Sequence, residues 1–373
     1  NYSTNQVTLQ DARLHLGESD LTLNGEIKQI RRAFLRGGKL TGQFKLHSQL
    51  IDCNQLMQAL YAGQQFAEQQ QPASFDEEAL THMTSDSLTA LTDSSNQLLV
   101  IPALLDLDFD MKADEIRFKD LTMKEVTGEV TLRDQRARLN QLQMQSNIGQ
   151  GQFSLAYATP TPQQAAMGID LDLQQIQVER LIDLYPAIDT LVPMLRSFEG
   201  VVDCQLTATC QTDSTFSLLF PTLKASCFLS GHHMTLLDGE TFTEISKTLM
   251  FKNKERNIID SIAVDLAIRD NQIEVFPFLI EMDRYKVAVG GTHNLDMTFN
   301  YHISVLKSPV PFKLGIDIKG NLDDFKYSIV KCKYKDFLKP AKQAELDSTR
   351  RNIRQELREA VRKELAKTAV SNP

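Results

Sequence analysis

The sequence lacks long apolar runs, an excess of basic residues and the paired cysteines of a metal site. Of its 373 residues, 42% are hydrophobic and 24% are charged, a balance that is ordinary for a folded chain and excludes wholesale disorder. No apolar stretch approaches the roughly 18 residues of a membrane-spanning helix, so we expect none within the chain. The chain begins with Asn1 and shows no signal peptide, so we expect a processed chain or a trimmed fragment, from which any N-terminal anchor or signal would be missing.

Basic residues are too few for a nucleic-acid-binding protein. The formal net charge is -8 and the sequence pI is about 5.5, whereas a nucleic-acid binder presents a basic surface. No lysine or arginine occurs from Leu46 to Met111, and ten acidic residues fall in that stretch. The rest of the chain therefore carries about +2 (-8 minus -10), and we expect no nucleic-acid partner.

Cysteines are scarce and do not form a recognisable framework. The five are Cys53, Cys204, Cys210, Cys227 and Cys332; the odd number and the absence of CxxC argue against a zinc site and a disulfide scaffold. Cys204 and Cys210 are roughly 20 Å apart on an unbroken strand and cannot pair with each other. Either could pair with Cys227 on a neighbouring strand in an oxidising compartment, although buried free thiols are the default expectation.

Catalytic motifs are also missing. The chain has no serine in a G-x-S-x-G frame and no phosphate-binding glycine loop, so we expect no enzyme activity, no catalytic residue and no cofactor. Asp106, Asp108 and Asp110 share one side of a strand, and an extended strand splays them, so we interpret them as a solvated face rather than a metal or glycosidase site. His232 and His233 would point to opposite faces of a strand, which predicts a surface position and no metal.

Alternation of apolar and polar residues is the strongest pattern present. It places one apolar set on one side of each strand, and short Asn-, Asp- or Gly-bearing turns separate the strands. The alternating residues are Leu105, Leu107, Phe109, Met111, Phe153, Leu155, Tyr157, Ile169, Leu171, Leu173, Ile273, Val275, Val287, Val289, Leu314, Ile316 and Ile318. The sequence therefore predicts a mostly-β, antiparallel architecture.

Helical patterns are few. Residues 54–61, 178–198 (interrupted by two prolines) and 242–249 are short candidates, and the clearest helix covers 340–368. Its thin apolar stripe consists of Leu346, Ile353, Leu357, Val361 and Leu365. This helix could lie on an anionic membrane, pair with another helix or pack across the open end of the sheet. We favour packing or self-association, because acids alternate with its bases and no aromatic residue lies in the stripe.

A weak internal repeat suggests an elongated sheet. Residues 50–60 and 175–185 are similar, and each follows a strand and opens a helix. We divide the chain into a first β repeat with a helix (1–62), a mobile acidic Gln/Ser/Thr-rich insertion (63–98) and a second β repeat with a helix (99–199). A C-terminal β region (200–338) and a charged helical tail (339–373) follow.

Three longer stretches resemble the C-terminal region of the AsmA-like family, relatives of TamB and of the bridge-like lipid-transfer proteins. They are KEVTGEVTLRDQRARLNQLQMQSNIGQGQFSL, FEGVVDCQLTATC with LSGHHMTLLDGETFTEISKTLMF, and the segment from IIDSIAVDLAIRDNQIEVF through G-x-x-x-LD at Gly291 to Met297. These are patterns of β-hairpins. The charged terminal helix and the Gln/Ser-rich insertion are not general marks of the family.

The resemblance implies a long, strongly curved antiparallel sheet, folded like a gutter, with an apolar concave side. It implies a periplasmic location, an inner-membrane anchor outside this chain and phospholipid passage toward the outer membrane. Residues expected to line a lipid-binding groove are Leu105, Leu107, Phe109, Phe153, Leu155, Ile169, Leu171, Phe278, Ile280, Val287 and Val289. The alternatives are an envelope interaction module that recruits partners through a sheet edge or the terminal helix, and, more weakly, a carbohydrate-active protein with facing carboxylates.

Overall fold

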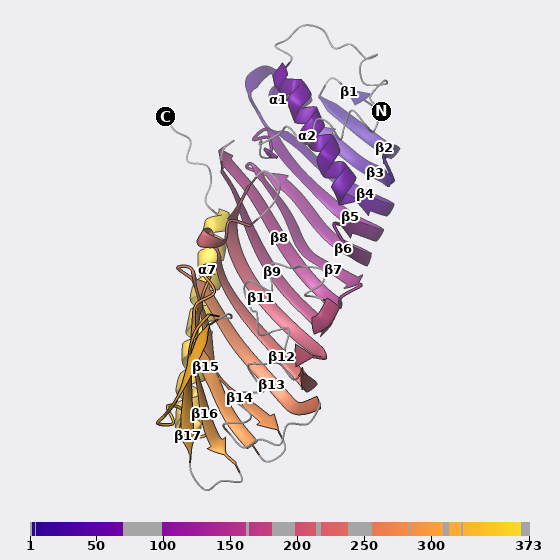
Figure 1. The fold of residues 1–373 in the computed structure, drawn as a ribbon. Helices are drawn as coiled ribbons and strands as arrows, with labels where there is room; N and C mark the ends of the chain where they lie inside the picture. The colour runs from indigo at the N-terminus through magenta and orange to yellow at the C-terminus, as the bar shows by residue number, and fades with distance from the viewer. Residues whose placement is uncertain are drawn as a thin grey trace.

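The chain forms one long curved sheet of eighteen strand segments (Figure 1). In this computed structural model, the described residues are 2–3, 5–69, 99–161, 164–180, 198–213, 218–237, 256–282, 285–308, 313–321 and 324–366. The mostly-β, open and curved antiparallel architecture expected from the sequence is confirmed.

The N-terminal half of the sheet contains nine strands and two helices. The strands are β1 (Tyr2–Ser3), β2 (Gln6–Leu16), β3 (Ser19–Lys28), β4 (Leu40–Asp52), β5 (Leu105–Phe118), β6 (Leu121–Arg133), β7 (Arg136–Ser146), β8 (Gln150–Thr161) and β9 (Gln164–Gln177). Helix α1 (Ile30–Arg36) joins β3 to β4, and helix α2 (Cys53–Gln69) follows β4.

The C-terminal half continues the same sheet. Its strands are β10 (Phe198–Glu199), β11 (Val201–Thr212), β12 (Lys224–Leu237), β13 (Arg256–Arg269), β14 (Gln272–Met282), β15 (Tyr285–Asn294), β16 (Phe299–Lys307), β17 (Leu314–Gly320) and β18 (Phe325–Val330). A short 3-10 turn, Phe220–Thr222, precedes β12, and helix α7 (Pro340–Ala366) follows β18. Because β10 and β11 both pair with β12, they are one strand interrupted at Gly200.

Among the described strands, pairing follows the order of the chain, with the short β10 beside β12, and all but one of the pairings are antiparallel. The exception is β4 with β5, which run parallel from Leu40 beside Leu105 to Asp52 beside Arg117. Parallel neighbours cannot be joined by a tight turn and need a long crossover. Here α2 and the chain up to Leu105 provide that crossover, so the antiparallel pattern expected from alternation fails at this one point.

Backbone bulges interrupt the alternation in a regular way. Gln141 in β7 and Gln175 in β9 have φ of 49° and 57°, and in β7 the register shifts between Leu139 and Leu142. An extra residue in a strand lets two side chains three positions apart face the same side. The amide of Gln141 donates to Ser154 Oγ at 3.0 Å, and that of Gln175 donates to Asp203 Oδ1 at 3.0 Å, so a side chain on the next strand satisfies each bulge.

The described helices differ from the sequence expectations in two ways. Helix α1 was not predicted. Helix α2 begins at Cys53 and runs to Gln69, past the end expected for the 54–61 helix. Of the 178–198 candidate only the first three residues and the last are described, and 242–249 and most of the 63–98 insertion lie outside the described residues. The terminal helix begins at Pro340 as predicted and is described to Ala366.

Candidate functional site

One face of the sheet carries a continuous row of mostly apolar residues, because directly paired residues on adjacent strands share a face. One such row takes one residue from each of sixteen strands, and none of the sixteen carries a carboxylate, ammonium or guanidinium group. In spatial order it reads Leu9, Gly25, Phe44, Phe109, Val130, Leu139, Leu155, Ile169, Ala208, Ala225, Ile268, Ile273, His293, Phe299, Gly320 and Phe325. We call the side of the sheet that carries this row the apolar face.

The eleven residues expected to line a lipid groove all lie on the apolar face. Leu105 and Leu107 share strand parity with Phe109, and Leu171 pairs with Phe153 two positions from the Leu155–Ile169 pair. The bulge in β14 returns Phe278 to the same face, where it pairs with Val289, and Ile280 pairs with Val287 beside it. These eleven residues therefore share one face, although their strands are far apart in the chain.

Most of these side chains are partly exposed to solvent. Phe278 and Val287 are buried, at 8% and 9% exposure, and the other nine are half-buried. Phe109 stacks on Phe44 with ring centroids 5.0 Å apart. An ordinary core would bury such residues almost completely, so this stretch of the face is only partly covered by the rest of the chain.

On the far side of the bulges at Gln141 and Gln175, the apolar face is covered by closely packed side chains. Leu142, Ile176 and Ile259 are at most 1% exposed and belong to one large cluster, against which Cys53 and Leu56 of α2 pack. The bulges at Gln141 and Gln175 bring Leu142 and Ile176 to the side that Leu139 and Leu173 already occupy. The apolar face thus has a packed part, which α2 contacts through Cys53 and Leu56 and which includes the buried row from Ala208 to Ile273, and a half-exposed part.

Helix α7 covers part of the opposite, polar face. Asp265 of β13 is 9% exposed, and its carboxylate binds Arg354 at 2.7 Å and Arg350 at 3.4 Å. Arg354 also lies over the ring of Phe228 at 5.3 Å. A buried carboxylate needs such partners to offset the loss of water.

The predicted apolar stripe of the terminal helix packs against other residues of the same chain. Ile353 and Leu357 pack against Ala267 and Phe276, and Leu346 packs in the cluster that contains Phe337. The side chains of Val361 and Leu365 lie outside the described residues. The helix lies across β9, β11, β12 and β13 rather than at the open end of the sheet.

A buried Asp–His–Ser arrangement was not found from the sequence. His302 Nδ1 lies 2.6 Å from Asp317 Oδ1, and His302 Nε2 lies 2.9 Å from Ser304 Oγ. The backbone amides of Lys333 and Tyr334 donate to His302 Nε2 and Ser304 Oγ at 3.1 and 2.9 Å. Ser304 is completely buried, so no substrate reaches its hydroxyl. The network instead attaches the segment after β18 to β16, unlike a nucleophile that a catalytic triad exposes.

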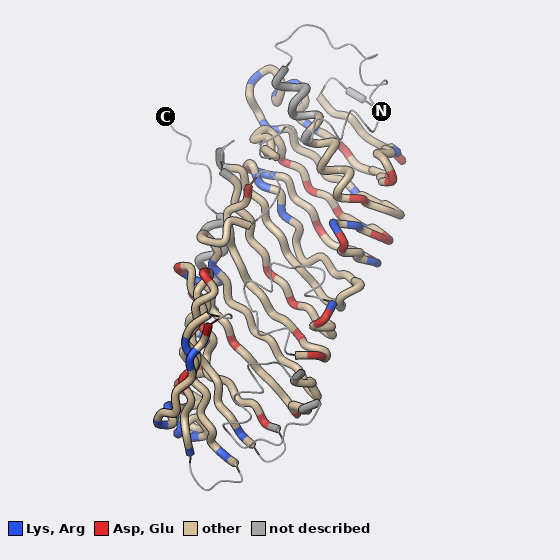
Figure 2. The backbone as a smooth tube through the Cα atoms, in the orientation of Figure 1, with Lys and Arg blue, Asp and Glu red and all other residues tan. Residues whose placement is uncertain are grey.

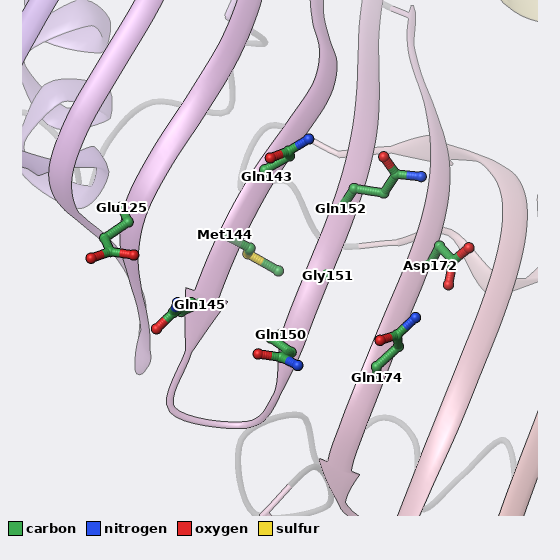
Figure 3. A pocket seen from close by; sticks show the side chains of 9 residues that line it. All are labelled: Glu125, Gln143, Met144, Gln145, Gln150, Gly151, Gln152, Asp172 and Gln174. Atoms are coloured by element: carbon green, nitrogen blue, oxygen red, sulfur yellow. The ribbon is translucent and has the colours of Figure 1, made fainter.

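Two acidic residues of β5 on the polar face share one basic partner. Asp106 and Asp108 both pair with Arg133, which agrees with the predicted solvated face. A hollow of about 420 Å³ lies over strands β6 to β9. Figure 3 shows Glu125 and Asp172 on opposite sides of it, with glutamines between them. The residues that line it come from β6 to β9 and include no base or aromatic ring. Within the described ranges, no group of three His, Cys, Asp or Glu residues could hold a metal ion, and His232 and His233 are both exposed.

Cys204 and Cys227 are neighbours on the apolar face. Their sulfur atoms lie 3.9 Å apart, on β11 and β12. The contact with Cys204 and burial raise the pKa of Cys227 well above its usual value, so the Cys227 thiol stays protonated at neutral pH. All five cysteines are free thiols in the structure.

We expect diamide to join Cys204 to Cys227 and to lower the titratable thiols of the unfolded protein from five to three. The 3.9 Å separation needs only a small side-chain rotation to bring the sulfurs into bonding distance. Thiol titration and peptide mass spectrometry after diamide treatment measure this. The control is the Cys204→Ser variant, which should keep all four of its thiols. If diamide removes no thiol from the unsubstituted chain, the β11–β12 register is contradicted.

No family model, curated protein or solved structure matches this chain. In the part of the chain that the structure describes, no helix is long and apolar enough to cross a membrane.

Proposed function

We propose that this chain holds the acyl chains of phospholipids along its apolar face. It would act as the C-terminal part of an AsmA-like protein of the periplasm, anchored to the inner membrane outside this chain. The role is passive: acyl chains lie against the sheet, head groups stay in water, and no residue performs chemistry. Movement of lipid toward the outer membrane would follow the long axis of the sheet.

The observation that carries this proposal is the length of the apolar face, whose row is half-exposed from Phe109 to Ile169 and buried from Ala208 to His293. The uncharged row from Leu9 to Phe325 crosses fifteen strand spacings, or roughly 70 Å at the usual separation of neighbouring strands. Each methylene that leaves water for such a surface contributes about 0.8 kcal/mol. A large exposed apolar surface marks an interaction site for lipid or protein, and its length suits a series of acyl chains better than a single small ligand.

The test is native mass spectrometry and organic extraction of the chain, purified from a bacterial periplasm without detergent. We expect near-stoichiometric phospholipid, lost when Leu107, Leu155 and Leu171 are together replaced by Asp. Charge on the half-exposed part of the face removes the favourable burial of methylenes and adds the cost of desolvating carboxylates.

A matched variant places the same three charges on the polar face. The substitutions Gln143→Asp, Gln152→Asp and Gln174→Asp fall on exposed residues of β7, β8 and β9 and should leave bound lipid unchanged. Folded protein that carries no lipid, or equal lipid loss in both triple variants, would overturn the proposal.

A second candidate function rests on the free edge of the sheet. Strand β18 pairs only with β17 among the described strands, and its Tyr327 and Ile329 are 44% and 66% exposed. An unpaired strand can accept a partner strand by β-addition, although short length and lysines such as Lys326 commonly protect edges from it. If lipid is absent, partners that add a strand to β18 become the leading explanation.

A further inference from the structure

Helix α1 turns its largest apolar side chains toward water. Phe34 and Leu35 are 71% and 73% exposed, whereas the small side chain of Ala33 faces the sheet at 8%. A helix that packs on a sheet normally buries the large residues and exposes the small and polar ones. Two adjacent exposed apolar side chains on a protruding connection therefore fit a surface that is itself apolar.

The same connection is strongly basic in an acidic protein. Residues 28–39 contain five lysines and arginines and no acid, whereas the whole chain has a net charge of -8. Lys28 and Lys39 pair with Glu26 and Asp134. Arg31, Arg32 and Arg36 are exposed and have no ion pair among the described residues. Figure 2 shows these basic segments gathered around α1, where β3 passes into β4.

The position of α1 brings this surface to the end of the apolar face. Leu40, which starts β4 just after the α1 connection, pairs with Leu105 at the start of β5, and its amide bonds the carbonyl of Leu104 at 2.7 Å. Leu104 itself is 38% exposed. An apolar surface touching α1 would therefore also lie beside the first residues of the half-exposed face.

We propose that α1 docks on the surface of an anionic lipid bilayer, with Phe34 and Leu35 inserted between head groups and the three free arginines over lipid phosphates. Exposed apolar side chains beside basic residues are the combination that holds interfacial helices on membranes. Each base near an anionic surface strengthens binding about fivefold. This contact is separate from the proposed holding of acyl chains on the sheet.

The chain has no tryptophan, so Phe34→Trp gives a single fluorescent reporter at the proposed contact. With vesicles of phosphatidylcholine containing phosphatidylglycerol, we expect a blue shift and quenching by brominated lipid. With pure phosphatidylcholine we expect binding to weaken about 100-fold, since the arginines lose their partners. Added salt should weaken binding to the anionic vesicles.

Flotation with the same vesicles separates the two contributions. Phe34→Ser with Leu35→Ser, and Arg31→Gln with Arg32→Gln and Arg36→Gln, should each weaken binding at least 30-fold. Matched controls at the far end of the sheet are Ile329→Trp, Ile329→Ser, and Lys326→Gln with Lys331→Gln and Lys335→Gln, which should not change vesicle binding. The proposal would be overturned if the fluorescence of Phe34→Trp shows no contact with lipid, or if the control variants lose as much vesicle binding as the α1 variants. Either result would point to a protein surface as the partner of α1.

The two proposals fail in different ways. The α1 variants should still co-purify with phospholipid, because the sheet is unchanged. The Leu107, Leu155 and Leu171 variant should still bind vesicles through α1. Loss of both properties in either variant would contradict the separation of α1 from the sheet.

Discussion

Replacing Leu142 with alanine is expected to lower the free energy of unfolding by about 3 to 4 kcal/mol. Leu142 is fully buried in the packed part of the apolar face, where neighbours on several strands cannot move in to fill the space. Large-to-small changes at such sites cost the lost burial and the remaining cavity together. Urea unfolding followed by circular dichroism measures the effect.

Leu107→Ala is the matched change on the half-exposed part of the same face. There we expect a loss of only about 1 kcal/mol, because water already reaches the side chain in the folded protein. Similar losses at the two sites would mean that the half-exposed part is packed like a core. That result would favour an interaction module over a lipid-holding surface.

Replacing Asp265 with alanine is expected to destabilise the docking of α7 by about 2 to 3 kcal/mol. The change leaves Arg350 and Arg354 without their shared carboxylate on a mostly buried surface. Breaking a buried ion pair is costly, and the partial exposure of both arginines reduces the penalty. Amide hydrogen exchange should show faster opening of α7, with β2 to β6 unchanged.

The control for this prediction is Asp347→Ala. Asp347 also pairs with Arg350, at 3.3 Å, but its side chain is 59% exposed, so we expect less than about 0.5 kcal/mol. Equal exchange in the two variants would show that the buried carboxylate does not hold the helix.

Local patterns predicted much of the sheet. Alternation of the type Leu105, Leu107 and Phe109 depends only on the two-residue period of a strand, so it identified the strands and the face that their apolar residues share. Short turns with Asn, Asp or Gly were also expected between strands. Asp134 and Gln135, with φ of 53° and 57°, form such a tight connection between β6 and β7.

Features that break the period were missed. Leu139 and Leu142 are three residues apart, as are Leu173 and Ile176, whereas a regular strand places same-face residues two apart. Interpreting these spacings as bulges would have located the packed part of the face. Helix α1 was missed because seven residues with exposed Phe34 and Leu35 carry no amphipathic pattern. The buried network of His302 was missed because its members come from β16, β17 and the segment beyond β18.

The sequence by itself determined that the chain forms strands with one apolar side, because that choice depends on the alternation of neighbouring residues. Only the tertiary structure decided which part of that side is filled and which stays half-exposed. That outcome depends on the parallel pairing of β4 with β5, on the bulges and on the placement of α2. It also decided that α7 lies on the polar face, because the partners of Asp265 are 85 and 89 residues away in the chain and meet it only when the sheet has formed.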